Sequence, residues 1–257
     1  FYIEMPVELM GRDFLVTNRL QKVQQELNDA GVNKGIVYQN QTLLFEVDSL
    51  LKHVTIRQQR ILPEVPAGDV IMESVSDNYV NPILARIKID AVSPDKKSVV
   101  FQINEFFNGS NTCINDLFNN INLGTSVISN LSRIISVKSF GDNLTATAEL
   151  TTKVIEGNSS VNVTSVVSST LTLLPEEPMM AREESNRVGY FTVSNLKYTD
   201  KQQSVERKHY VTRWRLEPSD KEAYMRGELV EPVKPIVFYV DKAMPKNLMP
   251  YIEKGIL

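Results

Sequence analysis

Residues 83–92 read Ile-Leu-Ala-Arg-Ile-Lys-Ile-Asp-Ala-Val, and this stretch decides the fold class. Charged side chains at every second position, from Arg86 to Asp90, alternate with apolar ones, which is typical of a β-strand with one face in solvent and the other buried. Residues 93–97, Ser-Pro-Asp-Lys-Lys, supply turn residues, and the apolar run Ser-Val-Val-Phe-Gln-Ile follows at 98–103. The stretch therefore predicts an antiparallel hairpin.

Strands are also predicted on both sides of this hairpin. Runs rich in β-branched, aromatic and other apolar residues occur at 42–47, 54–57, 133–140, 144–154 and 161–174. Pro175 and Pro178 end the last of these runs. We therefore predict a mainly β (α+β) fold, an antiparallel β-rich sandwich or curved sheet with a few short helices, spanning roughly residues 36–216.

Three segments depart from this pattern. Leu20, Val23 and Leu27 have helical spacing and predict a short amphipathic helix over 17–29. Residues 104–130 contain eight asparagines, which favour irregular backbone, so we expect a loop there with one short helix near 115–120. Ser219 followed by Glu222 has capping-box spacing and predicts a helix start.

The composition is that of an ordinary folded protein. Hydrophobic residues make up 42% of the 257 residues, and 28 basic against 31 acidic side chains give a net charge of −3, which argues against a polybasic nucleic-acid binder. Arginines alternate with Tyr210 and Trp214 over 205–216, but we interpret this run as a strand with its aromatic residues inward. Apolar runs are too short to predict a transmembrane segment.

The reactive residues form no recognisable site. The single cysteine, Cys113, cannot form an internal disulfide, and His53 and His209 lie too far apart in the sequence to make a paired metal motif. The adjacent pairs Glu176-Glu177 and Glu183-Glu184 are interpreted as exposed charge rather than as an acid/base dyad. We predict no catalytic, cofactor-binding or metal-binding residue in this chain. Six Asn-x-Ser/Thr triplets are given low weight as glycan acceptors and begin at Asn40, Asn108, Asn130, Asn143, Asn158 and Asn162.

The C-terminal residues predict a strand at 236–240, a Pro-containing turn, and a helix over 246–255 with apolar positions at Leu248, Tyr251 and Ile252. A strand and a helix alone cannot bury these faces, so we expect them to pack into a further domain. Because the sequence begins without Met and stops within a helix, we expect a processed or trimmed fragment with missing or mobile downstream sequence.

Several motifs resemble the N-terminal region of a Bacteroidota zinc-dependent metalloprotease family, which is metzincin-like. They are Leu-Leu-Pro-Glu-Glu-Pro-Met at 173–179, Arg-Val-Gly-Tyr-Phe at 187–191, Tyr-Val-Thr-Arg-Trp-Arg-Leu-Glu-Pro at 210–218, and Arg-Gly-Glu-Leu-Val-Glu-Pro-Val-Lys-Pro-Ile at 226–236. The shorter motifs Gly11-Arg12-Asp13 and Val137-Lys138-Ser139-Phe140 fit the same family. Under this resemblance the chain divides into an N-terminal helical or extended segment (1–35), a β-rich domain (36–218), a helix and Pro-rich linker (219–235), and the first strand and helix of a truncated peptidase domain (236–257).

The resemblance implies a zinc-binding His-Glu-x-x-His-x-x-Gly-x-x-His helix downstream, and no part of it occurs in this chain. We therefore expect a non-catalytic pro-region, scaffold or substrate-positioning module of a secreted or envelope-associated bacterial metalloprotease, with zinc held by the missing catalytic domain. Its expected partners are that domain, peptide substrate and other envelope proteins. The alternative is an independent accessory module of an outer-membrane lipoprotein complex without protease activity.

Overall fold

The computed structural model describes residues 1–256, and the chain forms two compact units. The first unit contains residues 1–178 and 196–206, and the second contains residues 179–195 and 207–256. The strands are β1 Tyr2–Pro6, β2 Asp13–Lys22, β3 Val37–Val47, β4 His53–Gln58, β5 Ile83–Val92, β6 Ser98–Gln102, β7 Arg133–Ser139, β8 Asn143–Glu156, β9 Ser159–Leu173, β10 Thr192–Lys197 and β11 Glu206–Val211. The α-helices are α1 Gln25–Asp29, α2 Ile71–Asn78, α3 Asn104–Phe107, α4 Leu117–Asn120, α5 Lys221–Met225 and α6 Met249–Ile256, with 3-10 turns η1 Val7–Leu9 and η2 Ser129–Leu131.

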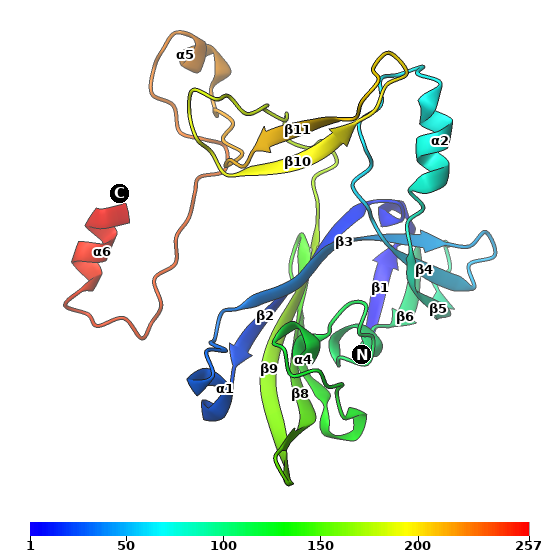
Figure 1. Ribbon diagram of the computed structural model, residues 1–257, viewed down its shortest axis with the longest axis vertical. Coiled ribbons are helices and arrows are strands. Elements are labelled where there is room, and N and C mark those ends of the chain that lie inside the picture. Colours follow the sequence, from blue (N-terminus) through cyan, green and yellow to red (C-terminus); the bar gives the residue numbers. More distant parts are fainter. Residues whose placement is uncertain (257) are drawn as a thin grey trace. The chain divides into compact units, whose positions relative to one another are not determined.

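The first unit is built on one curled antiparallel sheet of nine strands, in the order β1-β6-β5-β4-β3-β2-β9-β8-β7 (Figure 1). The predicted mainly β fold is therefore confirmed. The β5–β6 hairpin forms as predicted, and Ser93 and Asp95 side chains accept the backbone N–H of Lys97 in its turn. The longest hairpin joins β8 to β9 in unbroken register, and Gly157, at φ 58°, supplies the left-handed residue of its tight turn.

Segment 103–121 fills the concave side of this sheet. The predicted short helix is confirmed as α4, but the surrounding Asn-rich stretch is part of the core as well as a loop. Its apolar side chains are buried against strand residues such as Leu43, Phe45 and Leu150, and they are Ile103, Phe106, Phe107, Ile114, Leu117 and Phe118. Because an irregular backbone buried in a core must still pair its polar groups, asparagine side chains satisfy it locally. Asn111, for example, accepts from Cys113 N at 3.1 Å and donates to Leu84 O at 3.1 Å.

The helix predicted over 17–29 is wrong for its first half. Residues up to Lys22 belong to β2, and only Gln25–Asp29 is helical. Phe14, Val16, Asn18 and Leu20 are buried with an interval of two, because β2 lies between β3 and β9 and both neighbours satisfy its backbone. Within residues 1–35, β1 and β2 are strands of the large sheet.

The second unit has little regular structure. The strand predicted over 205–216 ends at Val211, and the aromatic burial expected beyond it is wrong, since Trp214 is 64% exposed. Asp220, rather than Ser219, caps α5 by accepting from Ala223 N at 2.9 Å. Residues 236–240 have no strand partner among the described residues, whereas α6 forms where a helix was predicted. Within residues 1–256, every helix falls short of the length and apolarity that a membrane span requires.

Candidate functional site

The reactive residues singled out in the sequence are not brought together. Cys113 is exposed in the Asn-rich segment, where its carbonyl accepts from Gln41 Nε2 at 2.7 Å. His53 Nδ1 lies 3.1 Å from Asp48 Oδ2, and His209 Nδ1 lies 4.0 Å from Glu184 Oε2. Among the described residues, no group of three or more His, Cys, Asp or Glu side chains is arranged to hold a metal ion.

The acidic pairs contact cations rather than each other. Glu176 lies 3.9 Å from Arg12, and Glu183 accepts from Lys208 Nζ at 2.9 Å. A carboxylate dyad for acid/base chemistry needs two carboxyl groups that face one reacting atom. Glu176 and Glu183 instead face Arg12 and Lys208.

The basic side chains around β11 also have local partners. Arg213 donates to Met180 O at 2.9 Å, and Arg215 pairs with Glu217 at 2.7 Å. Arg207 donates to Ser194 Oγ at 3.3 Å. These contacts are those of a paired strand surface, because a phosphate-binding surface leaves its guanidinium groups available to the ligand.

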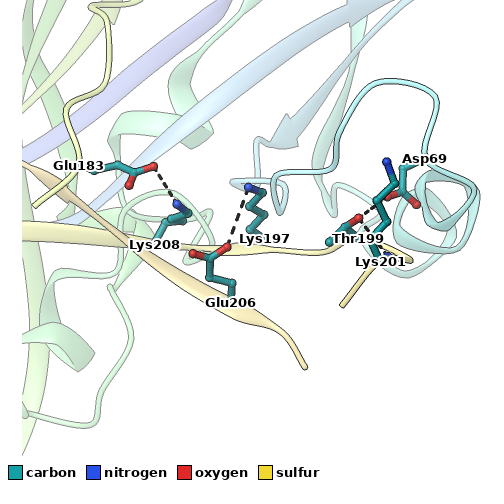
Figure 2. A network of polar contacts seen from close by, with 7 residues as sticks. All are labelled: Asp69, Glu183, Lys197, Thr199, Lys201, Glu206 and Lys208. Atoms are coloured by element: carbon teal, nitrogen blue, oxygen red, sulfur yellow. Dashed lines mark hydrogen bonds and ion pairs between the residues drawn. The ribbon is translucent and has the colours of Figure 1, made fainter. Parts of the chain in front are cut away.

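Asp69 joins two loops of the first unit (Figure 2). Its Oδ2 accepts from Thr199 Oγ1 at 2.7 Å, and its Oδ1 accepts from Ile71 N at 3.1 Å. These hydrogen bonds hold the pKa of Asp69 below its usual range, and the one from Thr199 makes the largest contribution. Asp69 is therefore ionised at neutral pH and serves as an anchor for the start of α2 rather than as a general acid.

The remaining ion pairs in Figure 2 fix the strands on which they lie. Lys197 Nζ is 3.9 Å from Glu206 Oε2 across the β10–β11 pair, and Lys208 joins Glu183 within the second unit. Each pair is partly exposed, so each contributes modestly to stability. We assign these contacts a structural role.

A polar hollow of about 640 Å³ lies in the first unit beside the end of α2, and we call it the amide-lined hollow. It is lined by residues 40–42 of β3, 58–61 at the end of β4, and 78–80. Its polar side chains are Asn40, Gln41, Thr42, Gln58, Gln59, Arg60, Asn78 and Tyr79, its apolar ones are Ile61 and Val80, and no carboxylate is among the described residues that line it. The size is within the range of small-molecule binding sites.

Part of this polar lining is already engaged. Gln59 Oε1 accepts from Asn81 Nδ2 at 2.6 Å, and Tyr79 shares a hydrogen bond with Tyr198 that raises the pKa of Tyr79. Within residues 1–256, the side chains of Asn40, Gln58 and Arg60 make no intramolecular hydrogen bond. Sequence reasoning missed this hollow, although the clustered amides of Gln-Asn-Gln at 39–41 and Gln-Gln at 58–59 were a signal.

The second unit exposes an extended apolar surface. Of its described residues, only Val211 and Ala223 are buried. Phe238 is 61% and Tyr239 93% exposed, and α6 has no buried residue although its apolar side chains share one stripe. Exposure of this many large apolar side chains is typical of a segment that a partner covers.

A family model described as "Domain of unknown function (DUF5117)" matches residues 35–219, which include seven of the strands of the large sheet and the β10–β11 pair. No curated protein and no solved structure matches the chain.

Proposed function

The chain belongs to the DUF5117 family, a description that assigns no activity, and from this premise we propose that it is the non-catalytic N-terminal part of a secreted or envelope-associated bacterial zinc metalloprotease. In this proposal the β-rich first unit is a scaffold or substrate-positioning module. The second unit is the connection to the catalytic domain. The motif resemblance, which is densest between residues 173 and 239, supports the protease assignment.

The observation that supports the proposal is that the second unit buries very few of its side chains. Residues 179–195 and 207–256 bury only Val211 and Ala223, whereas every other buried apolar residue lies in the first unit. Two buried side chains cannot offset the conformational entropy of ordering so many residues. The second unit therefore needs a partner surface, and a covalently linked domain provides one at high effective concentration.

The apolar side chains available for this contact are large. Leu229, Phe238 and Tyr239 are mostly or fully exposed, and burying a side chain of this size stabilises a contact by roughly 1.5–3 kcal/mol. Tyr251 and Ile256 add to the surface from α6. Residues 236–240 also leave backbone donors and acceptors available, so they can add as a strand to a sheet of the partner domain.

In this proposal the chain itself does not bind zinc. The described residues contain no cluster of His, Cys, Asp or Glu that fits the metal, and three protein ligands are the minimum for a catalytic site. We therefore assign zinc and all catalytic groups to the catalytic domain. This chain contributes positioning and packing alone.

The test uses the complete product of the gene that encodes this chain. We expect about one zinc per molecule, casein cleavage that a chelator abolishes, and slower backbone hydrogen exchange at 236–256 than in the 257-residue chain alone. Phe238→Ser in the complete product should speed exchange at 236–256 and leave exchange of β8 and β9 unchanged. A gene product without a zinc motif, or with equal exchange at 236–256 in both forms, would refute the proposal.

A second candidate is an accessory binding module of an envelope lipoprotein complex. The observation in its favour is that the first unit has a closed core of its own, centred on Phe101, Leu43 and Val54, and so can fold and bind without a protease domain. A gene product with an intact β-rich unit, no zinc and no proteolysis would support this candidate over the first.

A further inference from the structure

We propose that the amide-lined hollow beside α2 is a binding site for a neutral saccharide. It is formed by residues 40–42, 58–61 and 78–80, which lie far from the apolar surface of the second unit in the sequence. The inference concerns the first unit alone, and it does not depend on the protease proposal.

The chemistry of the lining matches a polyhydroxyl ligand. Each amide side chain offers both a donor and an acceptor, so Asn40 and Gln58 can each bind two neighbouring hydroxyl groups of one sugar ring. Arg60 adds a planar fork of donors for hydroxyl oxygens, and Tyr79 adds an aromatic ring whose face can pack against the C–H groups of a pyranose.

The charge of the lining excludes other classes of ligand. A single guanidinium, that of Arg60, is too little positive charge for a polyphosphate or a nucleic acid, which need several cations. No carboxylate lines the hollow among the described residues, so it offers no negative charge to a metal cation or a basic ligand. Ile61 and Val80 are the apolar side chains in the lining and both are largely exposed to solvent, so the hollow lacks the apolar enclosure that a lipid requires.

The backbone around the hollow argues against a peptide. Peptides are commonly held by free N–H and C=O groups of an edge strand. Here the N–H groups of Gln58, Gln59 and Arg60 already donate to Pro82 O at 3.0 Å, Thr42 O at 2.8 Å and Asn81 Oδ1 at 2.9 Å. These three N–H groups are therefore not available to a peptide, which leaves the side chains of this segment as its means of recognising a ligand.

The test is an array of neutral glucan, mannan, xylan and galactan oligosaccharides, with Ala-, Gly- and Ser-rich pentapeptides as the competing class, probed with the 257-residue chain. An oligosaccharide that binds is then titrated by calorimetry and by NMR. We expect a dissociation constant of about 1 mM or tighter, with shift changes confined to backbone signals of 40–42, 58–61 and 78–80.

The double variant Gln58→Ala/Arg60→Ala should weaken binding by at least about tenfold, because it removes one neutral and one charged hydrogen-bonding group. The matched control, Arg86→Ala/Asn162→Ala, removes an arginine and an amide that are exposed elsewhere and should leave the affinity unchanged. Urea unfolding of both variants establishes that the fold is intact.

Three outcomes would overturn the proposal. They are the absence of saturable binding by any oligosaccharide on the array, equal weakening by the two double variants, and a pentapeptide that binds at the hollow when no sugar does.

Discussion

Asn18 is one of the positions at which polar contacts inside the core join the sheet to the Asn-rich segment. Its side chain is fully buried on β2, donates from Nδ2 to Ile114 O at 2.9 Å, and accepts at Oδ1 from Ser169 Oγ at 2.6 Å. We expect Asn18→Ala to destabilise the first unit strongly, because Ile114 and Ser169 are each only 1% exposed and the groups that lose Asn18 are shielded from water.

The magnitude follows mainly from Ile114 O and Ser169 Oγ, which make the two shorter hydrogen bonds; Gln39 O, which accepts from Asn18 Nδ2 at 3.4 Å, also loses a donor. Leaving a buried donor or acceptor unpaired costs about 1–3 kcal/mol each, so Asn18→Ala should reduce the free energy of unfolding by about 2–5 kcal/mol. Ser169→Ala removes one hydroxyl and leaves only the amide oxygen of Asn18 unpaired, at a cost of about 1–3 kcal/mol. The double variant should lose less than the sum by about 1–2 kcal/mol, since the orphaned hydroxyl is then absent.

The assay is urea unfolding followed by far-UV circular dichroism, which reports the large sheet. Asn162→Ala is the matched control, because Asn162 is exposed on β9 and its replacement should change stability by less than about 0.5 kcal/mol. A loss below about 0.5 kcal/mol for Asn18→Ala, or strict additivity in the double variant, would refute the claim that this network joins the two elements.

Three further changes test the core, a turn and an electrostatic contact. Phe101→Ala should cost about 3–5 kcal/mol in urea unfolding, because Phe101 is fully buried in the larger core cluster. Gly109→Ala should cost about 1–3 kcal/mol, since Gly109 has φ 76° and an added Cβ would lie 2.7 Å from Cγ1 of the partly buried Val127. Gly124→Ala, at φ 64° in open space, should cost about 1 kcal/mol. Hydrogen bonds lower the pKa of Asp48, and the one from the backbone N–H of Lys52 contributes most. The stabilisation that Asp48 provides is therefore present above about pH 4 and is lost as the pH falls through the pKa of the folded state. Between about pH 5 and about pH 2, the urea midpoint should fall less for Asp48→Asn than for the unmodified chain.

The strands were predictable wherever one face of the strand is exposed to solvent and the other is buried. Arg86, Lys88 and Asp90 are exposed on β5, and the β8–β9 run lacks helix-compatible spacing, so both hairpins follow from local pattern. Residues 17–22 were misjudged because Leu20 also fits a helical interval with Val23 and Leu27. Leu20 lies in a strand because β2 pairs with β9, whose residues lie about 150 positions later in the sequence.

The burial of the Asn-rich segment and the amide-lined hollow could not be predicted by periodicity. Asparagine is a turn former in sequence statistics, and only the fold shows that Asn115 bonds Tyr38 inside the core at 2.7 Å. The hollow depends on the end of α2 lying next to residues 40–42 of β3 and the end of β4, which no local pattern encodes. Its amides were visible in the sequence as residue types, but their convergence was not.

The position of β2 between β3 and β9 sets an order of events for folding during synthesis. β2 is complete at Lys22, but its second neighbour is complete only at Leu173, and the core cannot close until that strand has been made. At about 5–20 residues per second, the ribosome needs on the order of ten seconds to bridge this interval. During that time the edge of β2 that later pairs with β9 is unpaired and its apolar side chains are exposed. We therefore expect the nascent chain to need chaperone protection and to fold late and slowly, as topologies with many distant pairings do.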